Sequence, residues 1–215
     1  MNRTSILKQP NNTSYFDEVY KVQKKYQNDL IHGLSERELV WIGQHNLCYT
    51  IGRGGNMNNV KPSFEHERFK IFDIDRGGEV TCHMPGQLVI YLVLNLKNYK
   101  KDLDWYLRKI EKIIVSVLQY FDVVSSTKKG LTGVWCGDKK IASIGIGCKR
   151  WVTIHGFSIN VNCDLNNFNK IVPCGIQDCS MTKLSYFNPK IEIFEVRNIV
   201  KKFIQAEFNI DFVSE

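Results

Sequence analysis

The sequence lacks the features of several classes of protein. No CxxC pair occurs, and the closest cysteines, Cys174 and Cys179, have no second pair at metal-ligand spacing, so we expect no structural zinc and no other metal. The seven cysteines are an odd number without framework spacing, which indicates reduced thiols in an intracellular compartment. Neither an apolar leader after Met1 nor a run of eighteen apolar residues is present, so we expect no secretion signal and no membrane span.

Acidic residues are somewhat fewer than basic residues. There are 22 Asp and Glu against 29 Lys and Arg, a formal net charge of +7 that favours acidic partners such as a carrier protein. The basic residues form scattered pairs without interleaved aromatics, so we do not expect nucleic-acid binding. With 43% hydrophobic residues in 215, the chain is predicted to be one domain over residues 1–215.

Periodicity predicts a mixture of helices and strands. Apolar side chains at helical spacing predict helices from Phe16 to Leu30, with Thr13 or Ser14 as cap, from Leu103 to Phe121, capped by Asp102 or Asp104, and near Val196 to Ile204. Strands are predicted at residues 38–42, 47–51, 69–75, 88–94, 133–136, 141–146 and 152–161. The order favours an α/β or α+β domain with a mixed, largely antiparallel sheet, and not a doubly wound one.

Two glycine-containing stretches invite a functional interpretation. Gly52 to Gly55 completes neither phosphate-loop fingerprint, and a plain turn is the favoured interpretation. Residues 76–87 contain three glycines and a proline, and such a demanding loop usually shapes a site. His83 in this loop is a candidate for either a site role or a structural one, whereas His155 is expected to be mainly structural.

Cys174 lies between Pro173 and Gly175, which predicts a tight turn with poor ladder bonding that a ligand can approach. This context suits a nucleophile, although a free cysteine is more often a buried apolar side chain. Lys139 and Lys140 open a strand after the turn at Gly137, and only one of them can face a given side of a sheet.

Five blocks taken together resemble the lipoyl(octanoyl) transferases: residues 76–88, 133–135, 140–145, 155–157 and 171–176. Residues 102–109 look most like the plastid and cyanobacterial branch. The resemblance implies the fold of the biotin and lipoate protein ligases, with a larger mixed and mostly antiparallel sheet, a small sheet and surrounding helices. It places the protein in a plastid stroma or in a bacterial cytoplasm.

The resemblance also implies an activity without a cofactor. Octanoyl-acyl carrier protein would be the donor, and the acceptor a lysine on lipoyl domains of 2-oxoacid dehydrogenase complexes or on glycine cleavage H protein. The matching nucleophile, which forms a thioester, is Cys174, and the matching lysine, which lowers the pKa of the thiol and moves protons, is Lys140. The matching substrate-binding positions are Arg76, Gly77, Gly78, Glu79, Val80, Thr81, Cys82, His83, Ser143, Ile144, Gly145, Gly156, Phe157 and Ser158.

Some residues depart from the family pattern. Met84 stands where glycine is usual and Cys82 replaces a common tyrosine, so we expect a narrower or differently shaped pocket wall. Two other functions stay open. One is an ATP-dependent lipoate or biotin protein ligase, for which Gly52 to Gly54 is a faint indication, and the other is a carrier-binding homologue without activity.

Overall fold

The computed structural model describes residues 3–61, 69–173 and 179–214, and these form two sheets with three long helices. The helices are α1 (Phe16–His32), α2 (Leu103–Tyr120) and α3 (Ile193–Phe208). The strands are β1 (Arg3–Lys8), β2 (Glu38–Gly43), β3 (Cys48–Ile51), β4 (Lys70–Asp73), β5 (Val80–His83), β6 (Gln87–Val93), β7 (Ser126–Lys128), β8 (Leu131–Cys136), β9 (Lys139–Lys149), β10 (Val152–Asn160) and β11 (Ile210–Val213).

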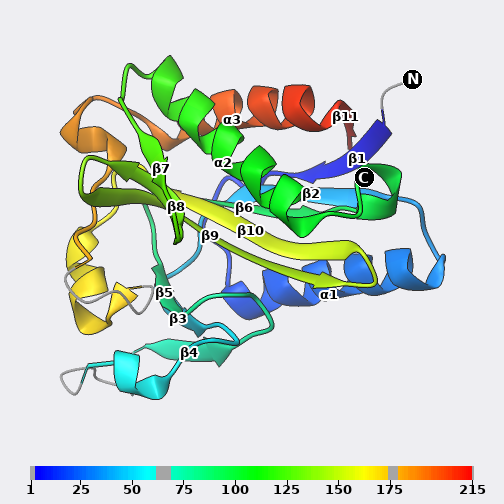
Figure 1. The fold of residues 1–215 in the computed structure, drawn as a ribbon, viewed down its shortest axis with the longest axis horizontal. Helices are drawn as coiled ribbons and strands as arrows, with labels where there is room; N and C mark the ends of the chain where they lie inside the picture. Colours follow the sequence, from blue (N-terminus) through cyan, green and yellow to red (C-terminus); the bar gives the residue numbers. More distant parts are fainter. Residues whose placement is uncertain (1–2, 62–68, 174–178, 215) are drawn as a thin grey trace.

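The larger sheet has eight strands in the order β11-β1-β2-β6-β10-β9-β8-β7. Only β1 pairs in parallel, with β11 and β2, and the other pairs are antiparallel. Helices α2 and α3 cover one face, and α1 lies on the other (Figure 1). The apolar stripes of α2 and α3 form the main core with strands β6 and β10, because a sheet and its helices must bury their apolar faces together.

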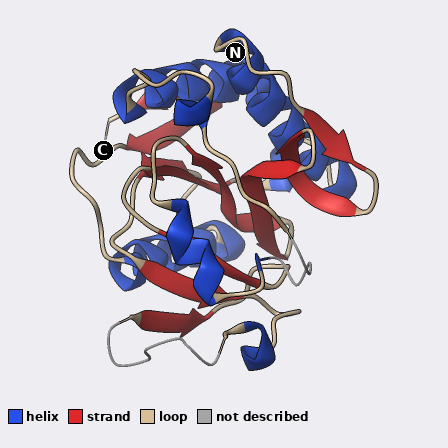
Figure 2. Cartoon of the chain, turned by 90° about the vertical axis from the view of Figure 1, so that its left-hand side faces the viewer, coloured by secondary structure: helices blue, strands red, loops and turns tan. Residues whose placement is uncertain are grey.

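The smaller sheet has the order β4-β3-β5 and lies on the α1 side of the larger sheet (Figures 1 and 2). Its own apolar cluster includes Tyr49, Cys82, Met84 and Phe168. The prediction that Met84 and Cys82 reshape the pocket wall is therefore wrong: both side chains belong to this cluster, where they are at most 1% exposed.

The predicted fold class, with a large mixed sheet and a small sheet, is confirmed, and so are the three helices. Asp102 caps α2 by accepting from the Trp105 N–H, as predicted. The predicted cap of α1 is wrong, because Tyr15 holds the cap position and Thr13 bonds to Asn46 instead.

Sequence periodicity missed β7 and β11, which are short and lie at the two sheet edges, and also β1, a strand of six residues between β11 and β2. It also treated residues 76–87 as a continuous loop, whereas Val80–His83 is a strand that pairs with β3. No helix in the described part of the chain is long and apolar enough to cross a membrane.

Candidate active site

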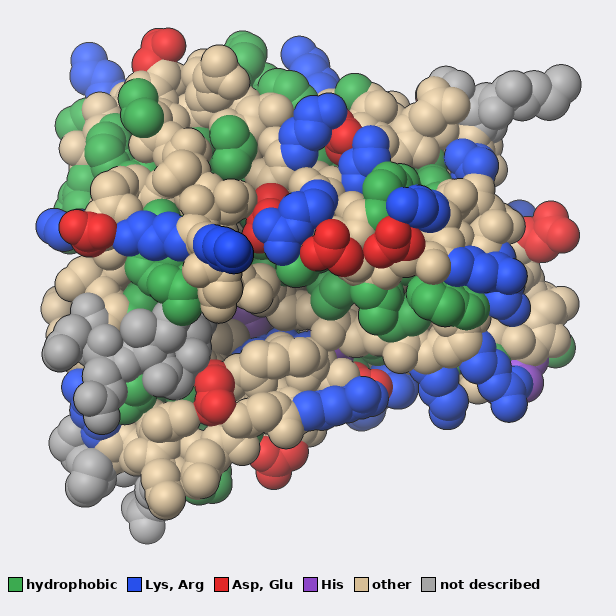
Figure 3. Space-filling view, viewed as in Figure 1, with side chains coloured by type: hydrophobic (Ala, Val, Ile, Leu, Met, Phe, Trp, Pro, Cys, Tyr) green, Lys and Arg blue, Asp and Glu red, His purple; other side chains and the backbone are tan. Residues whose placement is uncertain are grey.

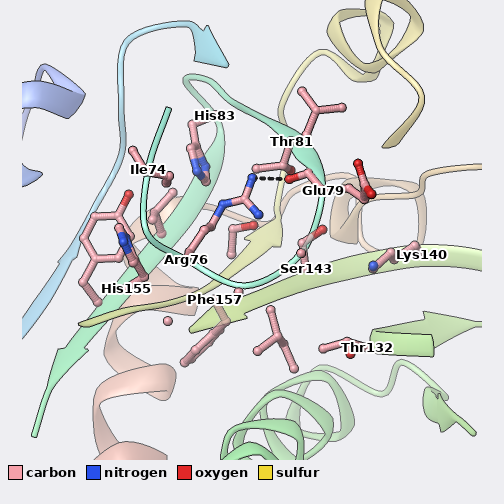
Figure 4. Close-up of a pocket in the computed structure, with 18 of the residues that line it drawn as sticks. Ile74, Arg76, Glu79, Thr81, His83, Thr132, Lys140, Ser143, His155 and Phe157 are labelled. Atoms are coloured by element: carbon pink, nitrogen blue, oxygen red, sulfur yellow. Dashed lines mark hydrogen bonds between the residues drawn. The ribbon is translucent and has the colours of Figure 1, made fainter. Parts of the chain in front are cut away.

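A cavity of about 230 Å³ lies between the two sheets. Figure 3 shows a hollow in the surface between the two sheets, with a histidine side chain visible inside it. One end is lined by exposed residues, among them Gly130, Leu131 and Thr132, and the other by buried ones, among them Val89 and Tyr91. Figure 4 places Lys140 and Thr132 at one end and His155 and Ile74 at the other. The cavity therefore runs from a polar mouth to a largely apolar inner end.

Arg76 organises the loop at the side of the cavity. Its guanidinium is buried and donates to the Thr50 carbonyl at 2.8 Å, to the Glu79 carbonyl at 2.6 Å and to the Gly77 carbonyl at 3.0 Å. The positive charge is thus spread over backbone oxygens of β3 and of its own loop, which holds residues 76–79 in a single conformation.

The turn at Gly52 to Gly55 supports that loop from behind. The N–H groups of Gly52, Arg53 and Gly54 donate to carbonyls of residues 79, 76 and 78, and the Gly55 N–H donates to the Gly52 carbonyl. A Cβ at Gly52 would lie 2.2 Å from the Gly78 carbonyl oxygen, so only glycine permits this contact. All four N–H groups are occupied, and the favoured interpretation as a plain turn is confirmed.

Lys140 enters the cavity from the start of β9 and is 2% exposed, whereas Lys139 beside it is exposed. Its Nζ lies 5.4 Å from the centre of the Trp135 ring. Gly133 has φ +128°, and a Cβ there would lie 2.4 Å from Lys140 Cε. The absence of a side chain at Gly133, next to an irregular register of β8 and β9, thus leaves the channel that holds this lysine.

Cys174 lies outside the described residues, but the chain on both sides of residues 174–178 is anchored. Before it, the Val172 N–H donates to the Asn59 carbonyl at 2.7 Å. After it, the Ser180 carbonyl accepts from the Lys140 N–H at 2.8 Å, and the Thr182 N–H donates to the Lys140 carbonyl at 2.9 Å. The chain that follows residues 174–178 is therefore paired with the backbone of Lys140.

His83 is a buried, neutral side chain on the cavity wall. Gln87 Nε2 donates to the Cys82 carbonyl and to Asn160, so Gln87 Oε1 accepts from His83 Nδ1 at 2.8 Å. Burial, reinforced by the neighbouring His45, lowers the pKa of His83 to about 3. The Nε2 atom of the neutral ring is therefore an acceptor.

At the inner end, His155 Nε2 donates to Asp75 Oδ1 at 2.9 Å. The Asp75 carboxylate also accepts from Tyr20 and Lys24, each at 2.9 Å. These partners, His155 first, hold the pKa of Asp75 well below its usual range despite partial burial. Burial lowers the pKa of His155, so the ring is neutral and carries its proton toward Asp75.

Most of the residues predicted to bind substrate line the cavity. Those that do are Arg76, Gly78, Glu79, Val80, Thr81, His83, Ser143, Ile144, Gly145, Gly156, Phe157 and Ser158, together with Lys140. Gly77 and Cys82 are not among the lining residues; Gly77 instead donates its N–H to the Ile146 carbonyl. At Gly156 two backbones approach closely, because a Cβ there would lie 2.3 Å from the Ile90 carbonyl oxygen.

Sequence reasoning missed the inner wall of the cavity. Phe16 belongs to the stripe of a helix, Val89 and Tyr91 to a continuous apolar strand, and Ile74 to the end of another predicted strand. Nothing in their local pattern separates a cavity wall from a core. Within the described ranges, no group of His, Cys, Asp and Glu is arranged to hold a metal.

Comparison with known proteins gives one family. A family model described as the lipoyl protein ligase A/B catalytic domain matches residues 18–205. Octanoyltransferases of Prochlorococcus marinus subsp. pastoris and of P. marinus strain MIT 9515 are 63% and 64% identical over 215 residues, and each match covers 100% of both chains. A bipartite lipoate protein ligase of Thermoplasma acidophilum has the same fold, with a TM-score of 0.78 at 15% identity over 100% of this chain and 87% of that one.

The chain belongs to the lipoyl protein ligase A/B catalytic domain family, and its two-sheet fold is that of a lipoate protein ligase. Within that class its full-length, high-identity relatives are octanoyltransferases, so the chain is an acyltransferase that acts on octanoyl groups in protein lipoylation. The Prochlorococcus relatives also agree with the predicted cyanobacterial branch.

Proposed function

We propose that the protein takes an octanoyl group from octanoyl-acyl carrier protein, holds it as a thioester on Cys174 and passes it to a lysine of a lipoyl carrier domain. The observation that carries the proposal is the position of Lys140: a buried lysine at the mouth of a cavity with an apolar inner end, bonded through its backbone to the chain that follows Cys174. A cation next to a thiol favours the thiolate, which is the nucleophilic form.

The reaction has two balanced halves. The Cys174 thiolate attacks the thioester carbonyl, the bond from carbonyl carbon to carrier sulfur breaks, and the Lys140 ammonium protonates the departing sulfur. The amine of the acceptor lysine then attacks the Cys174 thioester and gives a proton to Lys140, and the cysteine leaves as thiolate. Acceptors with this chemistry are lipoyl domains of 2-oxoacid dehydrogenase complexes and glycine cleavage H protein.

The size of the cavity supports an octanoyl chain. An apolar cavity of about 150 Å³ binds benzene, so the cavity of about 230 Å³ has room for a larger apolar group. At about 0.8 kcal/mol per buried CH₂, an enclosed chain contributes roughly 5 kcal/mol of gross binding free energy. The apolar inner end therefore accounts for recognition of the acyl chain without any further contact.

The structure gives the ATP-dependent alternative little support. The backbone N–H groups of Gly52 to Gly55, the only sequence indication of a phosphate site, all donate to protein carbonyls. The contacts of Lys140 disfavour the alternative of a carrier-binding homologue without activity. Gly133 leaves room for this side chain and the Trp135 ring lies beside its Nζ, and a protein that only binds a carrier has no need of a lysine buried in this way.

We place the reaction in a reducing bacterial cytoplasm. Cys48, Cys82, Cys136, Cys148 and Cys163 are free thiols, and the relatives are bacterial. An acyl-enzyme on cysteine also requires a compartment that keeps thiols reduced.

The test is intact mass after incubation with octanoyl-acyl carrier protein in the absence of ATP. We expect an octanoyl adduct on the unmodified chain and on Cys179→Ala, a matched control five residues away, but not on Cys174→Ala. Lys140→Met should slow adduct formation at least a hundredfold, as loss of proton transfer does, whereas Lys139→Met should leave it unchanged. An adduct that survives Cys174→Ala, or transfer that requires ATP and free octanoate, contradicts the proposal.

A further inference from the structure

His155 has a left-handed backbone angle, which is uncommon for a residue other than glycine. It has φ +64° in the middle of β10, and its N–H leaves the sheet to donate to Gln23 Oε1 at 2.9 Å. Glycine adopts such backbone angles at lower cost than histidine. A strained residue of this kind at a site points to a function of its side chain.

The ring is fixed from three sides. Asp75 accepts from Nε2 at 2.9 Å, the Tyr20 ring stacks on the imidazole at a centroid distance of 5.4 Å, and the Tyr91 ring meets it edge to face at 6.2 Å. Nδ1 is buried and has no hydrogen-bond partner among residues 3–61, 69–173 and 179–214. The side chain is thus kept in place at a cost in both backbone conformation and hydrogen bonding.

The position of this ring is the inner end of the cavity. His155 is 1% exposed and lines the cavity with Phe16, Val89 and Tyr91, which are at most 3% exposed. Figure 4 shows it at the opposite end from Lys140. A chain whose carbonyl lies near Lys140 therefore has its methyl end at His155, an orientation that rests on the proposed function.

We propose that the His155 imidazole, held by Asp75, closes the inner end of the cavity and sets the longest acyl chain that the enzyme transfers. The ring and its stacking partner stand where further methylene groups would lie. Chains longer than octanoyl then have to displace a side chain that three neighbours hold in place, whereas shorter chains leave part of the cavity unfilled.

The test compares chain lengths. We expect His155→Gly, which keeps the left-handed backbone without strain, to deepen the cavity and to raise the ratio of decanoyl to octanoyl transfer from the matching carrier proteins by roughly fifteenfold, for two added CH₂ groups. Each added buried CH₂ contributes roughly fourfold, the equivalent of about 0.8 kcal/mol. His155→Asn, which also tolerates this backbone angle, should give a smaller increase.

Arg150→Gly is the matched control. Arg150 also has a left-handed backbone, with φ +50°, but lies exposed at the tip of the same hairpin, outside the cavity lining. We expect its chain-length profile to equal that of the unmodified protein. If folding of His155→Gly is impaired, Val89→Leu tests the same end in the opposite sense, by shifting preference from octanoyl toward hexanoyl.

A second measurement separates this proposal from the thioester mechanism. Calorimetric binding of free octanoate and decanoate reports the cavity without any transfer chemistry. A ratio that stays within twofold in His155→Gly and His155→Asn, or an equal loss for all chain lengths, overturns the role of His155. A shifted binding ratio without an adduct on Cys174 leaves the role of His155 intact and contradicts the thioester.

Discussion

At the scale of single residues, the site depends on a glycine that no catalytic argument would select. Gly133 has a positive φ, and its missing side chain is the space that Lys140 occupies. Gly137, at the turn of the same hairpin, also has a positive φ, of +58°, but nothing lies within 4 Å of a Cβ there. A substitution at Gly137 therefore measures the free-energy cost of backbone strain alone, whereas one at Gly133 adds the cost of displacing Lys140.

We expect Gly137→Ala to lower the free energy of unfolding by about 1 kcal/mol and to leave octanoyl transfer unchanged. Gly133→Ala should cost about 3 kcal/mol, because overpacking adds to the strain, and should slow transfer at least tenfold. Urea unfolding and transfer to a lipoyl domain give the two quantities. Equal transfer rates in both variants would show that Lys140 does not need this channel.

At the scale of elements, the side wall of the cavity is built from two loops that hydrogen-bond to each other. Arg76 joins the end of β3 to residues 77–79, and the turn at residues 52–55 donates to the same loop. The side wall that Gly78, Glu79 and Val80 contribute therefore depends on one guanidinium.

Arg76→Met should release both loops, lower the free energy of unfolding by about 3 kcal/mol and slow transfer strongly, because buried carbonyls lose charged donors. Arg53→Met is the control, since Arg53 lies in the same pair of loops but is exposed. We expect the control to differ from the unmodified protein by less than about 0.5 kcal/mol. Similar losses in the two variants would contradict the role given to the guanidinium.

At the scale of the whole molecule, closing the two sheets on each other buries neutral histidines. Burial lowers the pKa of His45 to about 4, and burial with His45 nearby lowers that of His83 to about 3. Both values lie below the unfolded value of about 6.5. The unfolded chain therefore binds protons that the folded protein does not, and stability falls as pH decreases below about 6.5.

Between pH 7 and pH 5 each of these histidines should cost the folded protein about 2 kcal/mol, since a pKa unit corresponds to about 1.4 kcal/mol. Urea unfolding at the two pH values measures the loss. His45→Asn should reduce this loss of stability by about 2 kcal/mol, because it removes one of the two buried histidines. His45 bonds to Ser14 and Tyr91 and does not line the cavity. A stability that is flat over this range would mean that the histidines are not buried in the folded state.

Much of this molecule could be predicted from sequence. Apolar spacing was sufficient for α2, whose cap the sequence narrowed to Asp102 or Asp104. Alternation along β9 was sufficient to predict that only one of Lys139 and Lys140 faces the cavity. The glycine-rich loop at residues 76–79 was recognisable because unusual backbone angles require particular residues. These are local properties, set by nearest neighbours along the chain.

Other features could not be predicted in that way. Phe16, Val89 and Tyr91 line the cavity wall but have the same apolar sequence pattern as core residues. A buried apolar side chain gives the same pattern whether it contacts other side chains or a cavity. The same holds for Cys82 and Met84, whose burial in the small-sheet cluster depends on which way β5 and its turn face.

The sequence by itself determined the class of fold and the family, and it supplied the residues proposed for acyl transfer, because motif chemistry and periodicity are carried by short stretches. Only the tertiary structure decided which of those residues share a cavity, that Gly133 makes room for Lys140, and that His155 closes the inner end. Such facts depend on contacts between residues far apart in the chain, and the physical reason is that excluded volume and burial exist only once the two sheets have closed on each other.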